Sequence, residues 1–230
     1  MNAPARHILA LDTATEACSA ALYVQGDVTS HCQVDPRGHA RNLLPMIEVL
    51  LSEAGLKLQQ LDAIAFGRGP GSFTGLRIAA GVTQGLAFAA ELPVIPVSTL
   101  ATLAQGGDND AVLAAIDARM HEVYWAAFRR DRDGVMQPVV EEAVCPPDQV
   151  TCPGRGEWQA RGSGWKAYGD ELNKHCTGRI VQYEPEALPQ AADMIPLALQ
   201  LYRQGRSVSP EQAVPVYLRD QVVQAAKQGV

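Results

Sequence analysis

The feature that most constrains the fold is a pattern that occurs twice, about a hundred residues apart. Residues 8–12 and residues 112–117 are short apolar runs, and each ends in an aspartate. In both copies a polar turn and a second apolar run follow, and a hairpin turn, Gly26-Asp27 or Asp133-Gly134, then reverses the chain. A repeated unit of strand, aspartate turn, strand and hairpin predicts an α/β protein with two similar lobes.

The first copy continues into a regular α/β pattern. Apolar residues at helical spacing predict an amphipathic helix over residues 39–54, followed by a buried strand over 62–66. A glycine-rich loop and a helix over 76–90 complete a βββαβα order, and a strand over 93–97 follows. The polar residues 105–110 are the expected boundary between the lobes.

We therefore expect a lobe over residues 1–105 and a smaller one, with the tail, over 106–230. The second lobe is less regular in sequence. Proline and glycine clusters at 145–147, 152–156 and 161–164 indicate loops between short elements, and a helix is predicted over 189–203.

The amino-acid composition limits the classes of protein to which the chain can belong. With 47% hydrophobic and 19% charged residues in 230, the chain has ample material for a packed core, so disorder is excluded as its main state. A net charge of −6 gives no general attraction to a polyanion such as nucleic acid. Without a signal-peptide pattern or a run approaching ~20 apolar residues, a cytoplasmic protein is expected. Five scattered cysteines with no CxxC pair make a disulfide framework or a zinc site unexpected.

Two Asp-bearing hairpins in a two-lobed α/β chain resemble the actin-like, ribonuclease H-like ATPase architecture, in which such hairpins grip phosphates. Four segments make the resemblance more specific: DTAT (12–15), HARNLLP (39–45), GRGPGSFTGLR (67–77) and PVIPVS (93–98). In order and spacing they resemble the TsaB family, non-catalytic subunits of the bacterial tRNA threonylcarbamoyladenosine machinery. The resemblance is strong over residues 7–104 and weak over 117–124 and 215–219.

The resemblance implies a scaffold or activator subunit, not an enzyme, for modification of the adenosine beside the tRNA anticodon. The implied partners are a TsaD-type catalytic subunit, a TsaE-type ATPase subunit and a second copy of the chain, with tRNA reached only through the complex and no membrane involved. ATP and metal are expected on the partner subunits and no cofactor on this chain. The helices that begin at His39 and near Arg77 are the expected interface, with contacts from Leu43, Leu44, Ile47, Ala79, Gly81, Val82 and Gly85.

The alternative function is an actin-like ATPase or phosphotransferase with a weak nucleotide site of its own. Its phosphate contacts would be vestigial ones at Asp12, Thr13, Thr15 and Asp117. Against it, the first turn lacks the paired glycine that lets a phosphate approach the backbone closely, and no Gly-Gly-rich adenosine loop follows residue 165. ATP hydrolysis by this chain is therefore not expected.

The glycine-rich loop has two open interpretations. It fits neither the GxxxxGK[ST] pattern nor GxGxxG with a later acidic residue, so it is not a standard nucleotide loop. It can provide a tight turn and close packing with Ser72 or Thr74 as helix cap, or its backbone N–H groups can hold an anion. The residues concerned are Gly67, Gly69, Gly71, Ser72, Thr74, Gly75 and Arg77.

No catalytic residue and no metal site is predicted. The catalytic relative of the resembled family carries two histidines four residues apart just after the last strand of its first lobe, and Thr99 and Leu103 stand at the matching positions here. Neither side chain can replace imidazole as a metal ligand. His39 is expected as a helix cap or surface group, and Ser72 lies outside a GxSxG motif, which leaves a hydrolase poorly supported.

Overall fold

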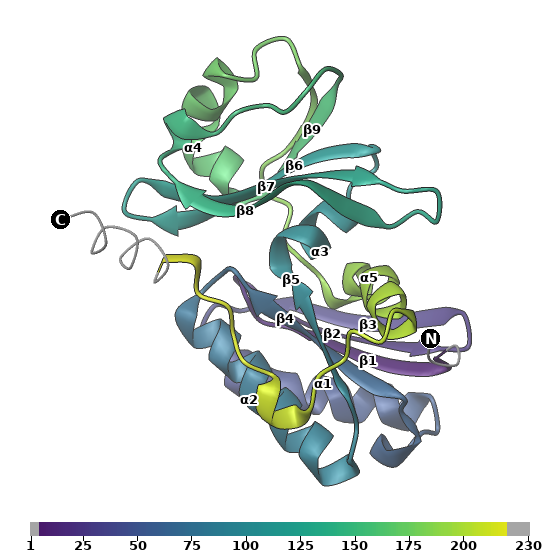
Figure 1. Ribbon diagram of the computed structural model, residues 1–230. Coiled ribbons are helices and arrows are strands. Elements are labelled where there is room, and N and C mark those ends of the chain that lie inside the picture. Colours follow the sequence, from purple (N-terminus) through teal and green to yellow (C-terminus); the bar gives the residue numbers. More distant parts are fainter. Residues whose placement is uncertain (1–4, 220–230) are drawn as a thin grey trace, which may run out of the picture.

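The computed structural model describes residues 5–219 and contains two five-stranded mixed sheets (Figure 1). The first sheet has the order β3-β2-β1-β4-β5. β1 pairs antiparallel with β2 and parallel with β4, and β4 pairs parallel with β5. Its strands are β1 (His7–Asp12), β2 (Ala17–Val24), β3 (Asp27–Val34), β4 (Ala63–Gly69) and β5 (Val94–Ser98).

The second sheet repeats this arrangement. Its order is β10-β9-β6-β7-β8, so that β6 to β10 take the places that β1 to β5 take in the first sheet. Again the first strand pairs antiparallel with the second and parallel with the fourth. The duplicated pattern in the sequence is thus confirmed as two sheets of one topology. The strands are β6 (Ala111–Arg119), β7 (Glu122–Arg130), β8 (Met136–Cys145), β9 (Trp158–Arg161) and β10 (Ile180–Glu184).

Helices and sheets alternate in layers. α1 (His39–Glu53) and α2 (Phe73–Ala90) cover the outer face of the first sheet, and α4 (Ser163–Lys174) covers the outer face of the second (Figure 1). α3 (Thr99–Gln105) and α5 (Ala191–Arg203) lie between the two sheets, in a core to which both sheets contribute. Because alternate side chains of a strand point to opposite faces, Ile8 faces this shared core while Leu9 faces α1 and α2. A strand buried on both faces reads as a continuous apolar run, as the sequence of β1 does.

Short 3-10 helices complete the described chain: η1 (Leu58–Gln60), η2 (Pro147–Gln149) and η3 (Pro210–Gln212). No helix within the described range 5–219 is long and apolar enough to cross a membrane.

Two predicted boundaries differ from the structure, and one helix is not predicted. β4 continues to Gly69 instead of ending at residue 66, and α2 begins at Phe73 instead of 76, so the loop between them is short. α4 was not predicted, because three glycines within 162–169 favour loop over helix; buried Trp165 and Leu172 stabilise it by packing on the second sheet.

The chain after β10 returns to the first lobe. The sequence prediction assigned everything from residue 106 onward to the second lobe, yet α5 packs on β1, β2 and β5. Beyond α5, Val208 forms a bridge to Val94 at the edge of the first sheet, and residues 213–217 contact α2 and the end of β4. The division at residue 105 stays a prediction, but the structure places these C-terminal residues with the first sheet.

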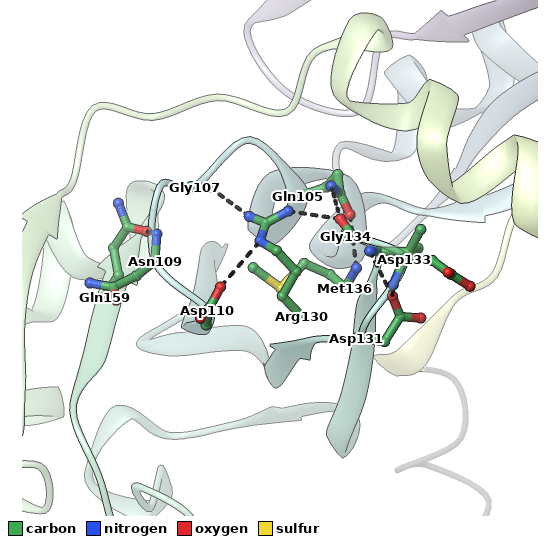
Figure 2. Close-up of polar contacts among 11 residues, drawn as sticks. Gln105, Gly107, Asn109, Asp110, Arg130, Asp131, Asp133, Gly134, Met136 and Gln159 are labelled. Atoms are coloured by element: carbon green, nitrogen blue, oxygen red, sulfur yellow. Dashed lines mark hydrogen bonds and ion pairs between the residues drawn. The ribbon is translucent and has the colours of Figure 1, made fainter.

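Hydrogen bonds fix the connection between α3 and β6 against the β7–β8 hairpin (Figure 2). The Arg130 guanidinium donates to the carbonyl oxygens of Gly107 at 2.7 Å and Gly134 at 2.9 Å. The Gln105 amide donates to the Gly134 oxygen at 3.0 Å and accepts from the Met136 N–H at 2.8 Å. The start of the crossing from the first sheet to the second is therefore held against this hairpin.

Candidate functional site

The first candidate site is the turn that follows β1. Asp12 is completely buried; its Oδ1 accepts a hydrogen bond from the Ala14 N–H at 2.9 Å, and its Oδ2 has no partner within the described chain. Burial raises the pKa of this carboxyl from 3.8 to about 7, because a charged group is poorly solvated there, and the single bond from Ala14 opposes the shift only in part. This carboxylate is thus neither exposed nor paired with a cation.

The glycine loop between β4 and α2 packs directly on this turn. A Cβ added at Gly67 would overlap Oδ2 of Asp12, and one added at Gly75 would overlap the Thr13 carbonyl oxygen. The Thr13 hydroxyl donates to the Gly75 carbonyl oxygen at 2.7 Å. Of the two interpretations, these contacts favour close packing, because the glycines bring backbone, not a ligand, against the turn.

The start of α2 is capped within the same loop. Ser72, one of the two predicted caps, is the N-cap residue, and its hydroxyl accepts from the Gly75 N–H at 3.5 Å. The Ser72 N–H donates to the Ala14 carbonyl oxygen at 2.8 Å. Thr74 is exposed in the first turn of the helix. Two of the amides that could hold an anion are therefore already used inside the protein.

The matching turn of the second lobe is also occupied. Asp117 Oδ1 accepts from the Arg119 N–H at 2.9 Å, and Oδ2 pairs with the Arg119 guanidinium at 3.0 Å. Arg119, Met120 and His121 all adopt positive φ, a conformation that costs non-glycine residues energy. Bulky side chains therefore occupy this tight turn. A phosphate-binding loop would have glycines there and would leave room for the phosphate.

His39 was expected as a cap or surface group, and that expectation is wrong. The ring is buried, its Nδ1 lies 2.9 Å from the Asp35 carbonyl oxygen and its Nε2 lies 2.7 Å from the Thr15 carbonyl oxygen. The ring thereby joins the β3–α1 loop to the first aspartate turn. The N-cap of α1 is Gly38. A histidine at a helix start carries no sequence pattern that distinguishes this buried connection from an exposed one.

The positions that hold metal in the catalytic relative of the resembled family lie on α3. Thr99 and Leu103 are both buried, Leu103 in the core between the sheets. The Thr99 hydroxyl has no hydrogen-bond partner in the described structure. No group of three or more His, Cys, Asp or Glu side chains that could hold a metal ion is found within residues 5–219.

The residues predicted for an interface divide into two sets. Leu43, Ile47 and Ala79 are buried in the core beneath α1 and α2, so they cannot reach a second chain, and their assignment to the interface is corrected here. The spacing of apolar residues identified the helices, but it could not tell an inward stripe from an outward one when both are apolar. The rest of the predicted set is at least partly exposed: Leu44, Val82, Gly81 and Gly85.

The outward stripe of α2 is the second candidate site. Phe73 and Phe88 are 56% and 71% exposed, and both glycines of the stripe, Gly81 and Gly85, are open: a Cβ added at either would meet no atom of the described residues within 4 Å. Neighbouring α1 adds Leu44, 44% exposed. Neither phenylalanine belongs to the interface predicted from the sequence, although positions 73, 77, 81, 85 and 88 follow the three-to-four residue spacing of one helix face.

Comparison with known proteins places the chain among tRNA-modification proteins. Residues 33–227 match the model of the TsaD family, described as tRNA N6-adenosine threonylcarbamoyltransferase. The chain is 49% identical over 222 residues to the tRNA threonylcarbamoyladenosine biosynthesis protein TsaB of Escherichia coli (strain K12), with 94% of this chain and 95% of the relative covered. Identity to the protein of the same name from Haemophilus influenzae is 43% over 227 residues, with 94% of each covered.

A solved structure agrees with these matches. The structure described as YeaZ from Pseudomonas aeruginosa is 49% identical and superposes with a TM-score of 0.87, with 93% of this chain and 100% of that chain covered. At this coverage the similarity includes both sheets and the helices between them.

Proposed function

Because this chain belongs to the TsaB family of tRNA threonylcarbamoyladenosine biosynthesis proteins, we propose that it is a non-catalytic subunit that pairs with a TsaD-type catalytic subunit. The reaction served is transfer of a threonylcarbamoyl group to the adenosine beside the anticodon. ATP and metal are bound by the partner subunits, among them a TsaE-type ATPase.

The observation that carries the proposal is the open stripe of α2. Two exposed phenylalanines flank Gly81 and Gly85, so the backbone of a neighbouring helix can approach closely between two apolar side chains. Exposed apolar patches on a folded chain mark binding surfaces, and aromatic anchors contribute most to such contacts. A face of this kind on one side of the first lobe suits a helical partner.

The aspartate turns support a non-catalytic role. The match to a transferase family also fits an enzyme, but Asp12 is enclosed by the glycine loop and Asp117 is engaged by Arg119. A phosphate group at this turn would collide with the glycine loop at Gly67 and Gly75, whereas a catalytic relative needs open space for the phosphate there. Thr99 and Leu103 also fail to offer metal ligands on α3.

The same face accounts for the other proposed partner, a second copy of this chain. A self-pair and a pair with the catalytic subunit would then compete for α2. Transfer RNA reaches the assembly through the partners, because a chain of net charge −6 repels a polyanion.

The test is to add bulk to the open face. Gly85→Trp places an indole where an added Cβ meets no atom, so the lobe should fold normally while close approach of a helix is blocked. Overpacking a tight contact costs about 1–3 kcal/mol, which corresponds to a fall in affinity of roughly 30-fold at 2 kcal/mol. Calorimetric titration against the TsaD-type subunit measures it, and sedimentation of the chain alone measures the self-pair.

Gly169→Trp is the matched control, because Gly169 lies in α4 of the second lobe and a Cβ added there also meets no atom within 4 Å. It should leave both pairings unchanged. A folded Gly85→Trp variant that binds the catalytic subunit as tightly as the unaltered chain would place the interface elsewhere. Loss of one pairing without the other would refute the shared surface.

A further inference from the structure

The described C-terminal residues 207–219 form an extended segment, here called the strap, which leaves α5 and ends beside the second lobe. In Figure 1 it passes through η3, follows α2 and reaches the gap between the lobes. It is separate from the two covalent crossings between the sheets, residues 106–110 and 185–190.

The base of the strap is fastened to the first lobe. Val208 and Val94 exchange two backbone hydrogen bonds of 2.8 and 2.9 Å, which adds a bridge to the edge of β5. Further along, the Gln84 side-chain amide of α2 donates to the Ala213 carbonyl oxygen at 3.1 Å. These bonds set the course of the strap along α2.

The middle of the strap contacts the glycine loop. The Val216 N–H donates to the Arg68 carbonyl oxygen at 2.8 Å. Gly69, with φ of +110°, lies so close that an added Cβ would be 2.9 Å from the Val216 carbonyl oxygen. The loop that encloses Asp12 is therefore itself held by the strap.

The end of the strap reaches the second lobe through Arg219. Its Nη2 donates to Glu122 at 2.6 Å and to the Ala118 carbonyl oxygen at 2.9 Å, and its Nη1 lies 3.5 Å from Sδ of Met120. All three partners belong to the β6–β7 hairpin, where the Arg119–His121 turn has positive φ. One arginine thus ties the C-terminal segment of the first lobe to the strained turn of the second.

Tyr217 lies between these two anchors and contacts the exposed face of α2. Its hydroxyl accepts from Nε of Arg77 at 3.1 Å, and its ring centroid lies 5.6 Å from that of Phe73. The Arg77 guanidinium is itself stacked on Phe73, 3.6 Å from the ring centroid. The side chains at the start of the open stripe are therefore positioned by the strap.

We propose that the strap fixes the second lobe on the first and, through Tyr217, holds Phe73 and Arg77 in the conformation that α2 presents to a partner. The second half of this proposal rests on the proposed function. Breaking the contacts of Arg219 then changes the face of α2 that binds the partner, although Arg219 lies away from α2, because the strap connects Arg219 to that face.

The test uses the full chain and the exchange rate of the Val216 amide proton, followed by NMR. Arg219→Ala and, from the other side of the ion pair, Glu122→Ala should each speed this exchange by about 10-fold or more, because the strap opens locally more often. The amides of Val94 and Val208, at the base, should exchange as before. Arg203→Ala is the matched control, since among the residues that the structure describes the Arg203 side chain donates only to a carbonyl oxygen of its own helix.

Two outcomes overturn the proposal at different points. Unchanged Val216 exchange in both anchor variants would show that Arg219 does not hold the strap. If the strap connects Arg219 to α2, Arg219→Ala and Tyr217→Ala should each weaken binding to the catalytic subunit several-fold. Tyr217→Phe, which keeps the ring, should weaken it less. Faster Val216 exchange with unaltered affinity for the catalytic subunit would show that the strap does not affect α2. If the unaltered chain does not bind that subunit at all, the proposed function fails while the exchange result still stands.

Discussion

The Asp12 carboxyl group is completely buried from solvent, and within the described chain it accepts one hydrogen bond. Burial raises its pKa from 3.8 to about 7, so the folded chain binds this proton more tightly than the unfolded chain does. The sign of the effect follows: below about pH 4 both states are protonated and nothing is lost, and as pH rises from about 4 to 7 the unfolded state is favoured by ionisation. The group therefore destabilises the fold increasingly above about pH 4, and the full effect is present above about pH 7.

Asp12→Asn should accordingly make the protein more stable at pH 8. A difference from 3.8 to about 7 is about three pH units, which at 1.36 kcal/mol per unit sets an upper limit of about 4 kcal/mol. The gain should shrink toward zero as the pH approaches 4. Urea denaturation of both proteins at pH 8 and pH 5 measures the free energy of unfolding.

Asp133→Asn is the control for the pH series, because that side chain is exposed and its neutralisation should alter the free energy of unfolding by only a few tenths of a kcal/mol. A variant at Asp12 that is less stable at pH 8 than the unaltered protein would show that the buried carboxylate has a compensating partner.

At the scale of elements, small and apolar residues line both sides of α2, yet the two sides have different neighbours. Ala79 faces the sheet and is completely buried, whereas Gly81, two residues later, faces outward. Ala79→Trp should therefore lower the thermal midpoint by several degrees or more, since overpacking costs about 1–3 kcal/mol and each kcal/mol is worth about 2–4 °C at this chain length. Gly81→Trp should leave the midpoint within a few degrees. Calorimetry of both variants checks this, and equal losses of stability would contradict the orientation of α2.

Much of the fold could be predicted because local patterns determine it. Strands buried on both faces produce apolar runs, an aspartate marks the end of β1 and another lies near the end of β6, and helix spacing identifies α1, α2 and α5. Features that depend on distant contacts could not be predicted. α4 forms despite its glycines because Trp165 packs on the second sheet, and Tyr217 is bound by Arg77, 140 residues earlier.

The candidate sites show the same division. The sequence pattern predicted the glycine loop and offered Ser72 or Thr74 as its helix cap, because a strand-to-helix turn needs both a tight turn and a cap; the structure shows that the cap is Ser72. It could not show that Oδ2 of Asp12 lacks a partner among residues 5–219 or that Leu43 points inward, since both depend on which segments meet in space. The exposed phenylalanines were missed because apolar residues in a helix are normally attributed to its core.

At the scale of the whole molecule, the net charge predicts how tightly the chain binds RNA. With a net charge of −6, the isolated protein should bind tRNA no more tightly than about 1 µM at physiological salt, in the range of non-specific contacts. Fluorescence anisotropy with labelled tRNA over a series of salt concentrations measures this. Submicromolar binding that weakens steeply with salt would reveal a basic surface that the net charge conceals.

We propose that this chain serves tRNA modification through the α2 face and not through its aspartate turns. The most direct measurement is threonylcarbamoylation of tRNA by the reconstituted subunits, with this chain unaltered, as Asp12→Asn or as Gly85→Trp. We predict that the Asp12→Asn protein supports the unaltered rate, because that carboxyl is enclosed by the glycine loop. The Gly85→Trp protein should support a much lower rate than the unaltered chain at subunit concentrations near the dissociation constant of the unaltered pair, because its affinity for the catalytic subunit is roughly 30-fold lower. A folded Asp12→Asn chain that still pairs with its partner but abolishes modification, beside an active Gly85→Trp chain, would contradict the account.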